Sequence, residues 1–147
     1  MQTIMQRSAL RSIATFAILA ILWSGAESAA VAGSDDKDKK PSLSLQVTPG
    51  LATAPARLRA RAVARGGADN YADFYCPILE WDWGDGTKSE SAKDCAPYEP
   101  NGSVIARRFS ATHTYQEGGQ FKVALRLKQK DRIVAMADSN VRVLDTH

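Results

Sequence analysis

The sequence has few of the residues on which many enzymes and metal sites depend. Its 147 residues include only two histidines, His113 and His147, and only two cysteines, Cys76 and Cys95. A structural zinc site needs about four such ligands, so zinc is not expected. The sequence also shows no internal repeat, which argues against solenoid and propeller architectures.

An excess of one charge is also lacking, because the formal net charge is only +3. Removing the first 32 residues takes away Arg7, Arg11 and Glu27 and leaves a net charge of +2. A balance this close to neutral does not by itself indicate a nucleic-acid partner, and none is expected.

The N-terminal segment predicts export. Residues 1–12 contain two arginines and no acid, and residues 13–23 form a mostly apolar run. This run is shorter than the roughly 20 residues that span a bilayer, which favours a signal peptide at residues 1–32 over a permanent membrane anchor. An uncleaved anchor stays open as an alternative, and Ala30 and Ala32 are alternative cleavage positions. The expected location is periplasmic or extracellular.

Residues 33–41 are charged and lack apolar partners, so they are expected to form a flexible leader. From residue 42 the apolar residues recur with period two, which is typical of half-buried strands. Strands are expected at residues 42–47, 57–62, 78–83, 121–128, 133–137 and 141–144. Residues 104–109 and 112–115 are either two short strands or one bent strand, and residues 88–102 are expected to be a loop. About seven strands without a convincing helix predict an all-β sandwich over residues 42–145.

The most informative stretch is residues 80–87, Glu-Trp-Asp-Trp-Gly-Asp-Gly-Thr. Trp81 and Trp83 are two residues apart, so in a strand both side chains leave the same face. Gly84 and Gly86 tolerate the positive φ that a tight turn requires. The stretch therefore predicts a strand that buries two tryptophans and ends at a sharp turn.

About thirty residues later, His113-Thr114-Tyr115 precedes a glycine and an alternating strand. Together the two blocks resemble the PKD domain, an immunoglobulin-like module found in polycystins, bacterial proteases and glycosidases. Its hallmark is W-D-F-G-D-G-T followed by H-T-Y, a glycine and an aromatic residue. The matching residues are Trp81, Asp82, Trp83, Gly84, Asp85, Gly86, Thr87, His113, Thr114, Tyr115, Gly119 and Phe121.

The resemblance implies an immunoglobulin-like sandwich of PKD type and a structural role for the motif residues. Asp82 and Asp85 are a carboxylate pair of the kind that glycosidases use, but the resemblance gives them hydrogen bonds to turn backbone. His113 is likewise part of the motif, so no catalytic residue is expected. The family is defined by a fold, and a fold does not determine one function.

Two further features follow from residue type. Cys76 and Cys95 are expected to form a disulfide in an exported chain, linking the loops on either side of the tryptophan strand. Asp69, Asn70 and Asp73 offer oxygen atoms to calcium, which some PKD-like domains bind near this loop. Their spacing is not that of an EF-hand, so calcium stays open as the one cofactor to consider.

Arg57, Arg59, Arg61 and Arg65 are the least expected feature of the sequence. Three of them alternate with apolar residues on one strand, where neighbouring like charges repel. One interpretation is a solvated face neutralised by cross-strand acids such as Glu80 or Asp138. The other is a docking patch for an anionic glycan, a lipid surface or an acidic protein.

Taken together, these patterns predict a non-catalytic exported module that recognises a protein or polysaccharide at the cell envelope. The alternatives are a structural spacer or accessory domain of a secreted hydrolase, and a small hydrolytic enzyme.

Overall fold

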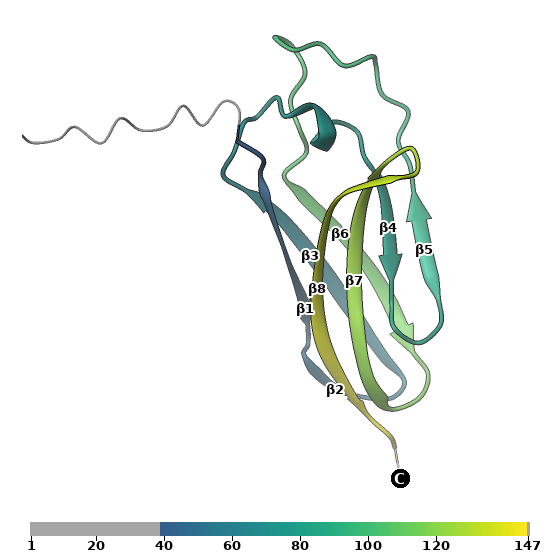
Figure 1. Cartoon of the computed structure of the whole chain (residues 1–147). Coiled ribbons are helices and arrows are strands. Elements are labelled where there is room, and N and C mark those ends of the chain that lie inside the picture. Colours follow the sequence, from purple (N-terminus) through teal and green to yellow (C-terminus); the bar gives the residue numbers. More distant parts are fainter. Residues whose placement is uncertain (1–38, 147) are drawn as a thin grey trace, which may run out of the picture. The chain divides into compact units, whose positions relative to one another are not determined.

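The computed structural model describes residues 39–146, which form two β-sheets that enclose one core (Figure 1). One sheet has three strands in the order β1-β3-β6, and the other has five in the order β2-β8-β7-β4-β5. The expected all-β sandwich is confirmed. The predicted signal peptide, most of the predicted leader and His147 lie outside the described residues.

The three-stranded sheet consists of β1 (Ser42–Thr48), β3 (Ala56–Arg65) and β6 (Arg108–Tyr115). Strand β3 lies at its centre and pairs antiparallel with both neighbours. Along β3, buried and exposed residues alternate almost throughout, because successive side chains in a strand point to opposite faces. This alternation directs Leu58 and four alanines into the core and the arginines outward.

The five-stranded sheet contains the antiparallel strands β4 (Ile78–Asp82), β5 (Lys88–Ser91), β7 (Gly119–Gln129) and β8 (Arg132–Leu144). The short strand β2 (Leu51–Thr53) pairs parallel with β8 at one edge. The inward side chains of the five-stranded sheet supply much of the core, including Trp81, Val123, Leu125 and Leu127.

Several expected boundaries were wrong. The segment 88–102 was expected to be a loop but contains β5, whose four residues are all exposed and so carry no apolar alternation. Residues 104–107 form no strand, and residues 132–144 form one long strand rather than two. Of the two alternatives left open for residues 104–115, the structure has the single strand, β6, over Arg108–Tyr115. A 3₁₀ turn, η2 (Ala72–Phe74), was not expected, and it places Phe74 in the core.

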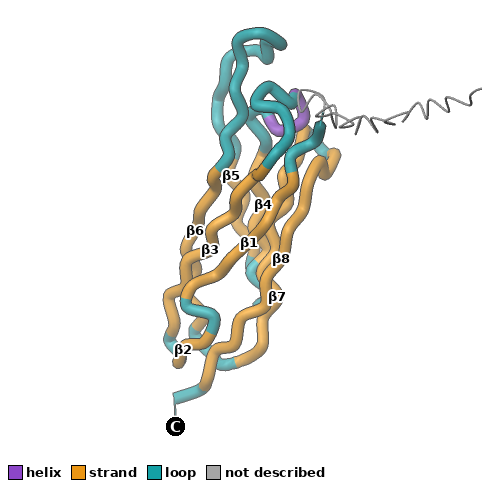
Figure 2. Tube along the Cα trace, turned by 90° about the vertical axis from the view of Figure 1, so that its left-hand side faces the viewer, coloured by secondary structure: helices purple, strands orange, loops and turns teal. Residues whose placement is uncertain are grey.

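The loops 66–77 and 92–107 gather at the end of the sandwich opposite the C-terminal end (Figure 2). Arg107 holds the first loop, because its guanidinium donates to Asp69 Oδ1 at 2.7 Å and to the carbonyls of Gly66 and Gly67. The chain before β1 meets the same loop, where the Ala68 N–H donates to the Lys39 carbonyl at 3.0 Å. Within residues 39–146, no helix is long and apolar enough to cross a membrane.

Candidate functional site

The four arginines singled out in the sequence share the outward face of β3. Arg57, Arg59, Arg61 and Arg65 are all exposed, whereas Leu58 and Ala60, which alternate with the first three, are buried. Val63, at the remaining outward position, is half-buried and lies directly opposite Arg108 of β6. Since directly opposed residues share a face, Arg108 joins the same surface. We call the five residues Arg57, Arg59, Arg61, Arg65 and Arg108 the arginine face.

Sequence reasoning missed Arg108, because its place depends on the pairing of two strands more than forty residues apart. Only the register of β3 with β6 brings Arg108 beside Val63. The signal that could have found it was the alternation of polar and apolar residues at the start of β6, which puts Phe109 inward and its two neighbours outward.

The arginine face contains no compensating acid. Strands β1, β3 and β6 have no aspartate or glutamate in their sequences. Among the salt bridges between residues 39 and 146, none involves an arginine of this face. The acids that were expected to neutralise it, Glu80 and Asp138, belong to the other sheet. The interpretation of a face neutralised by these two acids is therefore wrong.

The outer face of the five-stranded sheet is, by contrast, laced with ion pairs. Arg126 Nη1 lies 2.8 Å from Glu80 Oε1, and Lys128 Nζ lies 3.1 Å from Glu80 Oε2. The other pairs are Arg126 with Asp82, Lys88 with both Glu80 and Asp82, Lys128 with Glu90, and Lys122 with Asp138. The cations on the outer face of the five-stranded sheet are thus paired with carboxylates, whereas those of the arginine face are not.

The ion pairs also lower the pKa values of the carboxyl groups that take part in them. Hydrogen bonds from Lys128 and Arg126 hold the pKa of Glu80 below its ordinary value, and the bond to Glu80 raises the pKa of each cation. Burial opposes the ionisation of Asp82, but bonds from the Gly84 N–H and Arg126 lower its pKa overall.

Two open hollows lie on the arginine face. The larger is lined by Arg61, Arg65 and Arg108 together with polar side chains of β1 and β6, among them Gln46 and Ser110. The smaller is lined by Arg57 and Arg59 with Thr48 and Thr112. Both combine cationic groups with neutral hydrogen-bonding groups, which suits a ligand that carries negative charge and polar groups side by side.

The motif residues form a column of rings inside the sandwich. Trp81 stacks on Trp83 with ring centroids 5.7 Å apart, and Trp83 stacks on His113 at 4.7 Å. Tyr115 meets His113 edge-on at 4.8 Å, and its hydroxyl donates to the Trp83 carbonyl at 2.7 Å. The column joins the two sequence blocks that carry the PKD resemblance.

The turn after β4 uses both motif carboxylates. Asp82 Oδ1 accepts from the Gly84 N–H at 3.2 Å, and Asp85 Oδ1 accepts from the Thr87 N–H at 3.0 Å. Gly84 adopts φ +80°, and a Cβ there would meet the backbone of Lys122 at 2.7 Å, so no other residue fits.

The contacts of His113 differ from those of a catalytic triad. Its Nε2 lies 2.6 Å from Asp85 Oδ2 and 3.4 Å from Thr87 Oγ1. A triad uses the two ring nitrogens for different partners, one for the orienting acid and one for the nucleophile. Here both partners meet the same nitrogen, and the Thr87 hydroxyl donates to Asp85 at 2.6 Å. This arrangement suits a structural clasp.

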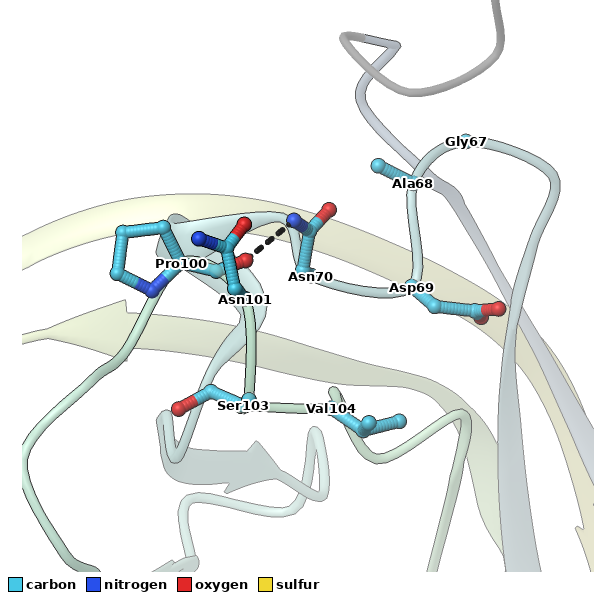
Figure 3. A pocket seen from close by; sticks show the side chains of 9 residues that line it. Gly67, Ala68, Asp69, Asn70, Pro100, Asn101, Ser103 and Val104 are labelled. Carbon is cyan, nitrogen blue, oxygen red and sulfur yellow. Dashed lines mark hydrogen bonds between the residues drawn. The ribbon is translucent and has the colours of Figure 1, made fainter.

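The calcium candidates do not converge on one point. Asp69 accepts from Arg107, the Asn70 amide donates to the Pro100 carbonyl at 2.7 Å, and Asp73 pairs with Arg132. Figure 3 shows the side chains of Asp69 and Asn70 pointing in different directions at the edge of a hollow between the two loops. Within residues 39–146, no group of three or more His, Cys, Asp or Glu side chains is placed to hold a metal ion.

The expected disulfide is confirmed, since Cys76 is bonded to Cys95. It joins the loop before β4 to the loop after β5. The pair ties together two loops at the end of the sandwich, and both cysteines line a hollow that Arg108 and Ser110 also line.

No protein-family model matches the sequence, and no curated protein matches it. Similar solved structures include the CARDB domain of a Pyrococcus furiosus protein, with a TM-score of 0.48 and 8% identity over 74% of this chain and 97% of that one. The PKD domain of an M14-like peptidase from a Thermoplasmatales archaeon has a TM-score of 0.45 and 15% identity, over 73% of this chain and 98% of that one. The PKD1 domain of the Vibrio cholerae metalloprotease PrtV has a TM-score of 0.41 and 16% identity, over 74% of this chain and all of that one.

At these identities the likeness concerns the fold alone. The chain itself folds as a β-sandwich of two sheets, and the ring column joins the two sequence blocks that resemble PKD domains. Its function has to be argued from its own surface.

Proposed function

We propose that this domain is a non-catalytic module of an exported protein and that it binds an anionic partner, a protein or a polysaccharide of the cell envelope, through the arginine face. The observation that carries the proposal is the contrast between the two sheets. One outer face pairs its cations with carboxylates, whereas the other exposes five arginines on strands without an acid.

The fold itself does not require arginine at these positions. The outward positions of β1 and β6 are filled largely by serine and threonine, which serve a solvated sheet face equally well. Arginines at alternate positions of a strand are about 7 Å apart, where two charges in water repel by roughly 0.6 kcal/mol. An arrangement that is unfavourable in the free protein becomes favourable once an anion lies between the cations.

The non-catalytic part of the proposal is supported by the motif residues, whose carboxylates and imidazole are all engaged within the fold. PKD- and CARDB-like domains are commonly non-catalytic modules of secreted proteins. Export is supported by the disulfide, because such bonds persist in oxidising compartments.

The test is retention on an anionic column as a function of salt. The variant Arg57→Thr, Arg59→Thr, Arg61→Thr should elute at clearly lower salt than the parent, since exposed charges are screened over about 8 Å at physiological ionic strength. The matched control is Lys93→Thr, Lys122→Thr, Arg142→Thr, which removes three exposed charges elsewhere. If the two variants elute together, net charge alone governs retention and the arginine face is not the site; a spacer role would then be the better account.

A further inference from the structure

The cations of the arginine face form one row along β3, in which Arg108 of β6 takes the place of a cation at position 63. Arg57, Arg59 and Arg61 follow one another at intervals of about 7 Å along β3. Val63 interrupts the row, but Arg108 lies directly opposite it on the neighbouring strand, only about 5 Å to the side, before Arg65 continues it. The row is therefore roughly 27 Å long. A ligand that meets all five cations has to be an extended chain with repeated negative charges, because a small anion reaches only one or two.

Two rows of neutral polar side chains flank the cations, because β3 is the central strand. Ser44 and Thr112 exemplify them, lying opposite Val63 on β1 and opposite Arg59 on β6. The complete rows are Ser42, Ser44, Gln46 and Thr48 on one side and Ser110, Thr112 and Thr114 on the other.

These flanking groups keep hydrogen-bonding capacity for a ligand. Within the described residues, the hydroxyls of Ser110 and Thr112 make no hydrogen bond to the protein. The hydroxyls of Ser42 and Ser44 donate to carbonyls of β3 and can still accept. The face thus offers a row of charge between two rows of hydroxyl and amide groups.

Other polyanions match only part of this pattern. Proteins that bind a lipid surface usually insert apolar side chains into it, in addition to their electrostatic attraction to anionic lipids. The large exposed apolar residues, Leu51, Val104, Ile133, Met136 and Leu144, all lie on other elements. A single-stranded nucleic acid calls for aromatic side chains on which bases stack, and the outward positions of β1, β3 and β6 have none. A peptide of glutamate and aspartate supplies carboxylates and backbone amides but no hydroxyl groups beside them.

We propose that the partner is a linear anionic polysaccharide, whose carboxylate or sulfate groups lie along the arginine row while its hydroxyl groups bond the polar side chains of β1 and β6. The inference rests on the proposed binding function and adds the class of the partner. The planar fork of arginine binds carboxylate and sulfate through two parallel hydrogen bonds, which suits it to such groups better than lysine.

The first measurement compares four probes on the full chain by calorimetry. Polygalacturonate carries carboxylates, heparin carries sulfates as well, polyglutamate is the acidic peptide, and vesicles of phosphatidylglycerol are the anionic lipid surface. Both polysaccharides are expected to bind. Polyglutamate of equal charge is expected to bind about tenfold more weakly, because it has no hydroxyl groups to bond the polar side chains of β1 and β6.

The second measurement separates charge from hydroxyl groups. Arg108→Thr should weaken every anionic probe by about three- to fivefold, as expected for an exposed charge pair, while Arg142→Thr on the outer face of the other sheet should weaken none. The pair Ser110→Ala and Thr112→Val, which removes hydroxyls and no charge, should weaken polygalacturonate and leave polyglutamate unchanged. The melting temperature of each variant shows that it is folded.

Two results overturn different claims. If polyglutamate or the vesicles bind as tightly as the polysaccharides, or if the hydroxyl variants change nothing, the polysaccharide is the wrong partner although anion binding stands. If Arg108→Thr and the triple arginine variant bind every probe as the parent does, the binding function proposed for this face fails as well.

Discussion

At the scale of single residues, the stability of the sandwich depends on the ring column. Trp81 and Trp83 are only 2% and 1% exposed, and the Trp83 indole N–H donates to Ser89 Oγ at 2.7 Å. We expect Trp81→Ala to lower the free energy of unfolding by about 3–5 kcal/mol, because it empties a buried aromatic site. Urea denaturation measures this loss. A variant that kept its stability but lost retention on the anionic column would mean that Trp81 contacts a ligand.

The carboxyl groups of Asp85 and Glu80 are expected to make the stability of the fold depend on pH in acid. Burial alone would raise the pKa of Asp85, but hydrogen bonds from Thr87 and His113 bring it below its ordinary value of 3.8, and the pKa of Glu80 is also lowered, from 4.5. A carboxyl with a lowered pKa stabilises the fold fully above its ordinary pKa, and this contribution is lost as the pH falls through the folded-state value. The melting temperature should therefore fall steeply below about pH 4.

Two variants test the source of that response. Glu80→Gln and Asp85→Asn keep hydrogen-bond acceptors but cannot be ionised, so both should melt lower than the parent at neutral pH and show a shallower decline in acid. A control is Glu117→Gln, an exposed acid outside both networks, which should melt at the same temperature as the parent at neutral pH. Parallel acid curves for the parent and both test variants would show that other groups govern acid unfolding.

At the scale of elements, the charge on β3 should make the free protein sensitive to salt. The three alternating arginines repel one another by roughly 0.6 kcal/mol for each adjacent pair before screening. The triple threonine variant should therefore be more stable than the parent by about 1 kcal/mol at low salt, with the gap closing as salt rises. Thermal melts across a salt series provide the measurement. A destabilised variant would indicate that the arginines are engaged with acids after all.

The disulfide acts on two loops and should contribute through the unfolded chain. Closing a loop with a sequence separation of 19 stabilises the fold by about 3 kcal/mol in the chain-entropy model. Replacing both cysteines by alanine should cost this amount in urea denaturation and leave binding to anions unchanged. Intact mass after alkylation without reductant shows whether the native protein carries the bond, and two alkylated thiols would contradict it.

How far the sequence predicts these elements depends on the kind of signal each one carries. Strand β3 was predicted because its apolar residues recur with period two, which also set the outward direction of its arginines. Strand β5 was missed because Lys-Ser-Glu-Ser has no apolar face and becomes a strand only through its pairing with β4. Arg108 and the true partners of Glu80 were out of reach, because register between distant strands is decided by the packing of the whole sandwich.

At the scale of the whole molecule, the two sheets differ in how their cations are neutralised. The outer face of the five-stranded sheet pairs its cations with its own carboxylates, and we infer that the cations of the arginine face are neutralised by a bound partner. The most direct test follows the arginine side-chain N–H signals by NMR while polygalacturonate is added to the full chain. The account predicts shifts for Arg57, Arg59, Arg61, Arg65 and Arg108, and none for Arg126, whose guanidinium is held by Glu80 and Asp82. Shifts centred on the face of Arg126, or spread evenly over both faces, would contradict it.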